Sequence, residues 1–537
     1  MTISRPTADT KADTESDRSA RAVKADDGLV GTAHPAVVVA VALSCAVALI
    51  ARFFVPTPLW LDEALSVNIA QLPLADIPEA LRSDGHPPLY YFLLHGWMQV
   101  FGDGDQAVRA MSGLISLAAL PFAYLAGRRV GGARLGLVTV AVLSLSPFFL
   151  RYGSETRMYS LIILLVFAGF VFVSHSLETP TWQWLAGSGV ATAALLWTHY
   201  WSFWLIGSVV LLLAIRIAQR RRSDRTWDRP ALATMLAMLI GGLAFLPWLP
   251  SFIFQAQHTG TPWAESFRPA TLVVTALTDF SGGPYSEMQL LMLYSVLLLA
   301  LGLFASGIDR WTLKVDLHTQ PDGRVPAIVA ATTVVTASIF GMITQSAFAP
   351  RYASVFFPFF VLILALGIDR FRGRITRSIV IGAFLLLSLV GLLFVFQFQR
   401  SQAEALVEVM ADAAPVDAMI VACPDQLGPS IERAARGTGW EVLTYPRFES
   451  AERVDWVDYA DRNALNNPEA FAAQLLDRAG DRTIFVTMNN SFLTLENQCS
   501  DVIAGLAAER APNLAVEGDG DEYFEPMTLY VFDPAGS

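Results

Sequence analysis

The sequence predicts a polytopic α-helical membrane protein with an additional α/β domain at its C-terminal end. Of the 537 residues, 54% are hydrophobic and only 16% are charged, and the mean hydropathy is +0.46. Soluble domains rarely have this composition. Apolar runs of roughly 20 residues recur up to residue 396, and such runs form spanning helices because hydrocarbon offers backbone polar groups no other partner. Acidic residues, by contrast, are concentrated after residue 400.

About eleven of these runs are long enough to span a membrane. They cover residues 36–55, 107–126, 135–150, 158–175, 184–198, 201–217, 231–254, 290–306, 325–345, 352–368 and 378–396. Residues 1–33 are polar and predict a disordered cytoplasmic tail. Residues 34–399 then form the transmembrane domain, and residues 400–537 form the α/β domain.

Basic residues predict the orientation, because cytoplasmic connectors retain Lys and Arg. With the N-terminus inside, the strongly basic connectors all lie on the cytoplasmic side: Arg128, Arg129, Arg134, Arg216, Arg220, Arg221, Arg222, Arg225, Arg310, Lys314, Arg370, Arg372, Arg374 and Arg377. An odd number of spans places the C-terminal domain outside. We therefore expect a multi-pass plasma-membrane protein with a cytoplasmic N-terminus and an extracytoplasmic C-terminal domain.

The C-terminal domain carries the acidity of the chain. From residue 401 it holds 24 of the 48 acidic residues, with 8 Arg and no Lys. Strand-like and helix-like stretches alternate in it, which predicts a small α/β layer. The stretches are residues 418–422, 429–436, 441–445, 468–479, 483–488, 502–510 and 528–532. No Gly-rich phosphate loop opens its helices. Cys423 and Cys499 both lie here, and an oxidising compartment favours a bridge between them, with buried free thiols as the alternative. No basic footprint for nucleic acid is present.

Unusual polar residues cluster in the connectors on the predicted outer side. Each has a structural explanation as well: an interfacial Arg can reach the lipid headgroups, and an acidic pair can complement a helix N-terminus. Their one-sided distribution nevertheless favours a site at the outer interface. The segments concerned are Trp60-Leu61-Asp62-Glu63, Ser83-Asp84-Gly85-His86-Pro87-Pro88-Leu89-Tyr90-Tyr91, Arg151-Tyr152-Gly153-Ser154-Glu155-Thr156-Arg157-Met158-Tyr159, Thr198-His199-Tyr200-Trp201 and Pro350-Arg351-Tyr352.

Over residues 36–396 these motifs resemble the integral-membrane glycosyltransferases of the GT-C fold, in particular protein O-mannosyltransferases and the lipid A aminoarabinose transferase. The resemblance implies a polyprenyl-phosphate sugar donor, an extracytoplasmic acceptor and inversion at the anomeric carbon. It matches Asp62 to the essential acid of the family and Glu155 to a second acid of many relatives. His86 stands where many relatives have Lys. The region from residue 401 has no counterpart with an assignable activity, which leaves the acceptor open among glycan, lipid and protein.

The chemistry of such a transfer predicts roles for these residues. A sugar hydroxyl needs a carboxylate to accept its proton, and Asp62 is the predicted general base. The chemistry requires no acid partner, so a catalytic role for Glu155 is what the resemblance implies. A departing lipid phosphate needs cationic donors. The predicted substrate-binding residues are Glu63, His86, Arg157, Tyr159, His199, Arg351 and Tyr352. A Gly- and Pro-containing connector, residues 255–288, is expected to form a loop over the site, with Trp263 as a sugar platform or a membrane anchor.

We expect no cofactor, because the sequence contains no metal-ligand spacing, although a divalent metal is not excluded. Two alternatives have the same polytopic character. A lipid or glycan transporter or flippase would show internal repeats and charges at mid-membrane. A polymerase or ligase of lipid-linked glycans would use the same chemistry with a longer donor.

Overall fold

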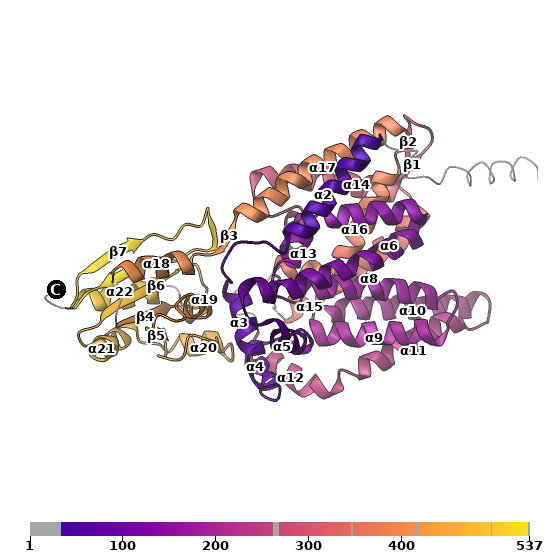
Figure 1. The fold of residues 1–537 in the computed structure, drawn as a ribbon. Helices are drawn as coiled ribbons and strands as arrows, with labels where there is room; N and C mark the ends of the chain where they lie inside the picture. Colours follow the sequence, from indigo (N-terminus) through magenta and orange to yellow (C-terminus); the bar gives the residue numbers. More distant parts are fainter. Residues whose placement is uncertain (1–33, 261–267, 345–346, 414–416, 496, 535–537) are drawn as a thin grey trace, which may run out of the picture.

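The computed structural model describes residues 34–260, 268–344, 347–413, 417–495 and 497–534. It consists of a large helical bundle and a C-terminal α/β region that lies at one end of the bundle (Figure 1). The predicted disordered tail, residues 1–33, and the predicted role of Trp263 fall outside the described residues. The helices of the bundle are α2 Pro35–Ala51, α3 Leu61–Ala70, α4 Ile77–Asp84, α5 Leu89–Phe101, α6 Asp105–Ser144, α7 Pro147–Gly153, α8 Tyr159–Ser176, α9 Trp182–Thr198, α10 Ser202–Ser223, α11 Arg229–Leu243, α12 Leu249–His258, α13 Pro269–Phe280, α14 Ser286–Phe304, α15 Pro321–Thr344, α16 Phe357–Asp369 and α17 Arg374–Gln397.

Six helical segments of the described chain are long and apolar enough to cross a membrane: Asp105–Ser144, Tyr159–Ser176, Ser202–Ser223, Arg229–His258, Pro321–Thr344 and Arg374–Gln397. Four shorter apolar helices accompany them, namely Pro35–Ala51, Pro269–Phe280, Met288–Phe304 and Phe357–Asp369. The prediction of a polytopic helical membrane protein is therefore confirmed. The finer count of about eleven spans stays a prediction, although each predicted run coincides with a helix.

Two predicted spans, 107–126 and 135–150, meet within α6. Gly131 and Gly132 have non-helical backbone angles, and Gly132 has a φ of 86°, which only glycine adopts readily. The two halves pack against each other beyond this point: a Cβ on Gly136 would come within 2.7 Å of the Tyr124 carbonyl oxygen. The helix thus reverses direction at the glycine pair, and its halves are two separate apolar segments.

The prediction of a loop over residues 255–288 is wrong for residues 269–280, which form α13. This segment begins with Pro269 at its first turn, where proline is tolerated because that N–H has no intrahelical partner. Leu272, Ala276 and Phe280 recur every four residues and are buried. The short apolar stripe was overlooked because the Gly and Pro residues on either side dominate the sequence signal. A 3-10 helix, η3 Pro350–Val355, packs against it.

The C-terminal region contains a five-stranded mixed sheet in the order β5-β4-β6-β9-β7. β4 runs parallel to β5 and β6, while β9 runs antiparallel to β6 and β7. The predicted alternation of strands and helices is confirmed, although the sequence does not predict β3, α18, α20, β7 or β8. The elements are β3 Gln399–Ser401, α18 Ala403–Ala413, β4 Ala418–Cys423, α19 Gly428–Ala434, β5 Glu441–Thr444, α20 Tyr459–Asn463, α21 Pro468–Ala479, β6 Thr483–Met488, α22 Gln498–Ala507, β7 Pro512–Val516, β8 Tyr523–Glu525 and β9 Thr528–Phe532.

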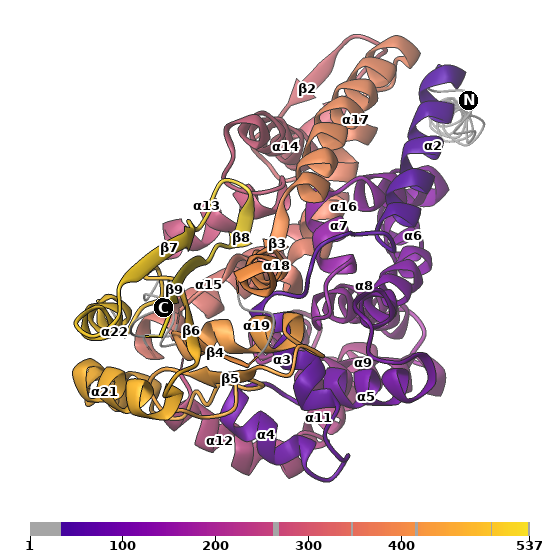
Figure 2. The same cartoon turned by 60° about the vertical axis from the view of Figure 1, so that its left-hand side comes forward.

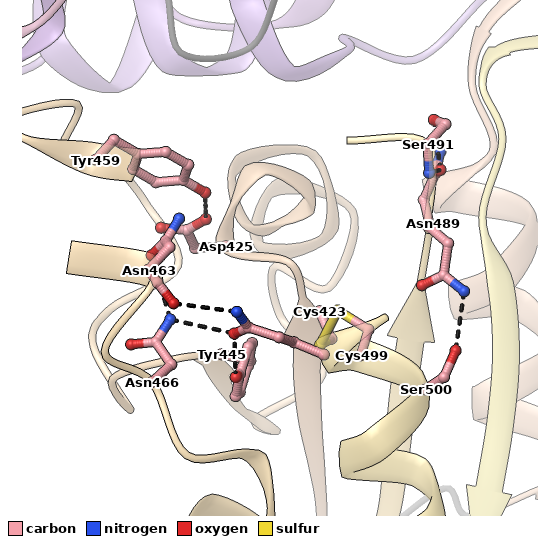
Figure 3. Close-up of a disulfide and its surroundings, with 12 residues drawn as sticks. Cys423, Asp425, Tyr445, Tyr459, Asn463, Asn466, Asn489, Ser491, Cys499 and Ser500 are labelled. Atoms are coloured by element: carbon pink, nitrogen blue, oxygen red, sulfur yellow. Dashed lines mark hydrogen bonds between the residues drawn. A yellow bond between two sulfur atoms is a disulfide. The ribbon is translucent and has the colours of Figure 1, made fainter. Parts of the chain in front are cut away.

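A disulfide bond joins the last residue of β4 to the first turn of α22, with 5.7 Å between the Cα atoms of Cys423 and Cys499. The predicted bridge is therefore present. Figure 3 shows it next to a hydrogen-bonded group in which Tyr445 donates to Gln498 at 2.6 Å. The disulfide bond fixes α22 to the carboxyl end of β4.

The C-terminal region contacts the segment between the first two spans. α19 packs against α3, and β3 pairs in parallel with β8 directly after the last spanning helix (Figure 2). Trp60 and Leu61, at the start of α3, belong to the same hydrophobic cluster as Met419 and Val421 of β4. The first helix after the first span is therefore shared between the bundle and the α/β region.

Candidate active site

Helix α3 directs its two neighbouring carboxylates into different surroundings. Successive residues of an α-helix are about 100° apart, so Asp62 and Glu63 cannot face the same partners. The Asp62 side chain is 15% exposed, whereas that of Glu63 is fully buried. The Asp62 carboxylate faces two guanidinium groups, at 3.8 Å from Nε of Arg157 and 3.4 Å from Nη2 of Arg351. The structure thus brings together a carboxylate and two cations from three distant parts of the sequence.

Arg157 is held in place by a set of hydrogen bonds around its guanidinium group. Its Nη1 donates to Ser66 Oγ at 2.9 Å and to the Tyr91 hydroxyl at 3.2 Å. Its Nη2 lies 3.0 Å from Nε2 of His86, whose Nδ1 lies 2.8 Å from Asp84 Oδ2. Arginine can only donate, so Nε2 of His86 accepts and Nδ1 carries the proton toward Asp84. His86 therefore orients Arg157 in this arrangement.

Aromatic rings line the other side of the cluster. The His199 ring lies 4.9 Å from that of Tyr352, 6.1 Å from that of Tyr159 and 6.4 Å from that of His86, centroid to centroid. Nδ1 of His199 accepts a hydrogen bond from the backbone N–H of Trp201 at 3.1 Å, so its Nε2 carries the proton. The aromatic residues surround the ion group with rigid, largely buried surface.

Glu63 lies in a separate, buried ion cluster. Its carboxylate accepts from Arg109 at 2.6 Å and from Arg400 at 2.9 Å, and from the backbone N–H of Thr156 at 2.8 Å. Burial by itself would raise the pKa of Glu63, but the two guanidinium groups lower it below the ordinary value. The cluster ties α3 to α6, to the segment before α8 and to β3. A substrate-binding role for Glu63 stays a prediction, and this geometry gives the residue a structural role.

Glu155, the second predicted acid, is also buried, with 1% of its surface exposed. Burial raises its pKa, and the nearby Glu63 carboxylate acts in the same direction, although Arg400 opposes both. Its Oε1 has no hydrogen-bond partner among the described residues. Glu155 is therefore a buried acid with one carboxyl oxygen that lacks a hydrogen bond among the described residues, and its catalytic role stays a prediction.

Sequence reasoning singled out seven residues that the structure places in one group: Asp62, His86, Arg157, Tyr159, His199, Arg351 and Tyr352. It did not assign roles to Arg109 or Arg400, although one signal could have found Arg400. That residue follows the last span on the predicted outer side, where the positive-inside rule disfavours Arg. An arginine retained there calls for a specific partner. Within the described ranges, no group of three or more His, Cys, Asp or Glu side chains could hold a metal ion.

Comparisons with known proteins concern the family resemblance and the fold. Residues 85–250 match the family model described as dolichyl-phosphate-mannose-protein mannosyltransferase. That range contains His86, Glu155, Arg157 and His199, whereas Asp62 precedes it. A search of the curated proteins finds no match.

Two solved structures of ArnT from Cupriavidus metallidurans have the same fold. The apo structure has a TM-score of 0.55, and the structure bound to undecaprenyl phosphate has a TM-score of 0.53. Each is 12% identical to this chain, and each alignment covers 91% of this chain and 97% of that one. At this identity the likeness establishes the fold, including the C-terminal region beyond the bundle.

Proposed function

We propose that this chain, a membrane-embedded glycosyltransferase of the GT-C fold, moves a sugar from a polyprenyl-phosphate donor to an acceptor on the extracytoplasmic side. The observation that carries the proposal is the placement of the Asp62 carboxylate beside Arg157 and Arg351. A proton acceptor and a phosphate-binding pair are the two elements that such a transfer requires. The undecaprenyl phosphate in one of the ArnT structures supports a polyprenyl phosphate as the lipid of the donor.

In the proposed reaction, Asp62 acts as the general base. The acceptor oxygen forms a bond to the anomeric carbon while the bond from that carbon to the phosphate oxygen breaks. The proton of the acceptor hydroxyl goes to the Asp62 carboxylate. Attack from the face opposite the phosphate inverts the anomeric centre. The products are the glycosylated acceptor and a lipid monophosphate, and this step needs no added oxidant or cofactor.

Arg157 and Arg351 stabilise the phosphate that leaves. The lipid monophosphate gains negative charge as the anomeric bond breaks, and two guanidinium groups can share that charge through strong hydrogen bonds. His86, Tyr91 and Ser66 keep Arg157 in place, so little reorganisation is needed at the moment of reaction. Tyr159, His199 and Tyr352 supply the walls against which the sugar binds.

The extracytoplasmic placement of the site rests on two independent features. The basic connectors predict a cytoplasmic N-terminus, and the Cys423–Cys499 disulfide is of the kind that persists in an oxidising compartment. Both favour the same orientation. In this orientation the donor lipid reaches α3 from the bilayer that surrounds the spanning helices.

Purified protein incubated with labelled polyprenyl-phosphate sugars and a membrane extract tests the proposal. We expect one sugar to reach an acceptor per turnover, with release of bare polyprenyl phosphate. Transfer of an intact longer glycan would instead identify a polymerase or ligase. Labelled product with the Asp62→Asn variant at the wild-type rate would remove Asp62 from the role of base.

A further inference from the structure

The α/β region contacts both ends of the helix that carries Asp62. At the first turn of α3, the backbone N–H of Leu61 donates to Oε1 of Glu525 at 3.1 Å. Near its last turn, the side chain of Asn68 donates to the carbonyl oxygen of Glu452 at 2.7 Å. Figure 2 shows α3 beside α19 of the α/β region. The ends of α3 are thus fixed by residues that follow it by several hundred positions in the chain.

Glu525 replaces a cap that the local sequence does not supply. The first backbone N–H groups of a helix lack intrahelical partners, and a side chain at the N-cap normally accepts from one of them. The N-cap of α3 is Trp60, whose side chain makes no capping hydrogen bond. The carboxyl group at the end of β8 provides the acceptor instead. Leu61 and Glu525 are 464 positions apart in the sequence.

The surroundings of Glu525 suit a neutral carboxylic acid. The residue is 4% exposed, and its Oε2 lies 2.7 Å from Ser401 Oγ. Burial raises the pKa of Glu525 to about 8, although hydrogen bonds with Ser401, Ser430 and Leu61 act in the opposite direction. The Asp62 carboxylate makes a smaller contribution that also raises it. Both oxygens accept in the structure, Oε1 from Leu61 and Oε2 from the Ser401 hydroxyl. In the protonated acid the Ser401 contact reverses, because a hydroxyl can also accept. The protonated acid also adds no second negative charge beside Asp62.

Arg400 is the second residue of the α/β region that contacts the first turn of α3. Its guanidinium group donates to Glu63 Oε1, to the Ser154 carbonyl oxygen and to Ser154 Oγ, each at 2.9 Å. Its own backbone N–H donates to Thr57 Oγ1 at 2.7 Å. Because Arg400 is part of β3, these bonds link the beginning of the α/β region to α3, to Thr57 before it and to Ser154 before α8.

We propose that Arg400 and Glu525 are positioning residues that hold the first turn of α3, and with it the Asp62 carboxylate, in its place between the two arginines. The α/β region is in this way a component of the active site. A displacement of about 1 Å at a reacting group can lower a rate roughly 100-fold, so a loosened α3 would reduce turnover. This proposal rests on the proposed function for its kinetic consequence alone.

We call the contacts of Glu525 and Arg400 that hold the first turn of α3 the clamp. Hydrogen exchange tests the clamp without reference to activity. In full-length protein, Glu525→Ala should raise amide exchange in a peptide that covers residues 59–70, because Leu61 loses its acceptor. Glu525→Gln should leave exchange near that of wild type, since an amide can accept from Leu61 and donate to Ser401. Asp458→Asn is the matched control: it removes an exposed contact between the α/β region and His258, away from α3. Equal increases in residues 59–70 and in the five-stranded sheet for Glu525→Ala would indicate general unfolding and overturn the proposal.

Kinetics provides the second readout. Glu525→Ala and Arg400→Gln should lower kcat about 10- to 100-fold with little change in the KM for the donor, since misplacement of the base affects the chemical step. Glu525→Gln and Asp458→Asn should retain kcat within about 3-fold of wild type. A wild-type kcat for Glu525→Ala, or an equal loss in Glu525→Ala and Glu525→Gln, would refute the clamp. Absence of transfer by the wild-type protein would instead contradict the proposed function, and the exchange result would still decide the clamp.

Discussion

Replacing Glu63 by Gln should destabilise the protein strongly. Among the described residues, Glu63 is the only acid that forms an ion pair with the buried guanidinium groups of Arg109 and Arg400. Arg109 and Arg400 would keep their hydrogen bonds to backbone and to Ser154 but lose their counter-charge. Removal of one partner from a buried ion pair costs about 3–5 kcal/mol. That is a large fraction of the roughly 5–15 kcal/mol that stabilises a typical native protein.

Thermal unfolding in detergent, followed by intrinsic tryptophan fluorescence, measures this effect. Glu79→Gln is the matched control: it is the same chemical change on neighbouring α4, at a carboxylate that is 80% exposed and 4.0 Å from Arg82. Exposed pairs contribute about 0–1 kcal/mol, so the control should unfold near the wild-type temperature. Glu63→Gln that unfolds at the same temperature as Glu79→Gln would refute a structural role for the buried cluster.

The pH dependence follows from the lowered pKa of Glu63. A carboxylate with a pKa below its ordinary value of 4.5 stabilises the folded state above that value. The contribution is lost as the pH falls through the lowered folded-state pKa. Wild-type protein should therefore lose stability in acid more steeply than Glu63→Gln. Parallel losses in the two proteins would show that the carboxylate contributes nothing through its charge.

Two further predictions concern the donor site and the orientation. Arg157→Ala and Arg351→Ala should each weaken donor binding about 10-fold or more, since a charge-assisted hydrogen bond contributes about 1.5–3 kcal/mol. Arg82→Ala, at a side chain of α4 that is 41% exposed, should not. Unchanged donor affinity in both site variants would leave these arginines as headgroup contacts. A cysteine introduced at Ser223 should be labelled only from the cytoplasm and one at Ser450 only from outside; the reverse pattern would place the site in the cytoplasm.

Local sequence signals were sufficient for most of the helices and for the central strands of the α/β region. Apolar runs set the spanning helices, because length and composition alone satisfy the membrane. Short-range patterns predict a strand at residues 418–422 and a helix at residues 468–479, and the structure has β4 and α21 there. Helix α13 was not, since flanking Gly and Pro residues concealed a stripe of only three buried positions. Strand β7 is mostly exposed, so it carries no hydrophobic alternation to detect.

The candidate site could be predicted only up to the level of its motifs. Span order and orientation brought Asp62, Arg157 and Arg351 to one face, and their mutual contacts agree with that expectation. The structural role of Glu63 could not be predicted, because it depends on which side of α3 meets Arg109 and Arg400. Those contacts connect residues 46 and 337 positions apart in the sequence. Side-chain direction at such separations is set by packing, which no local pattern encodes.

The capping of α3 by Glu525 was equally inaccessible to sequence reasoning. Nothing in the residues around Glu525 distinguishes it from the other acids of the α/β region, which contains half the acidic residues of the chain. Only the parallel pairing of β3 with β8 brings it to the start of α3.

The central claim is that Asp62 removes the acceptor proton while the arginines bind the donor, and one measurement separates these roles. Donor binding and single-turnover transfer should be measured side by side on wild type and Asp62→Asn. Asparagine keeps the size of the side chain but cannot accept the proton, so we expect donor affinity within about 3-fold of wild type and a transfer rate at least about 100-fold lower. An Asp62→Asn protein that binds the donor and transfers the sugar at a near-normal rate would contradict the account.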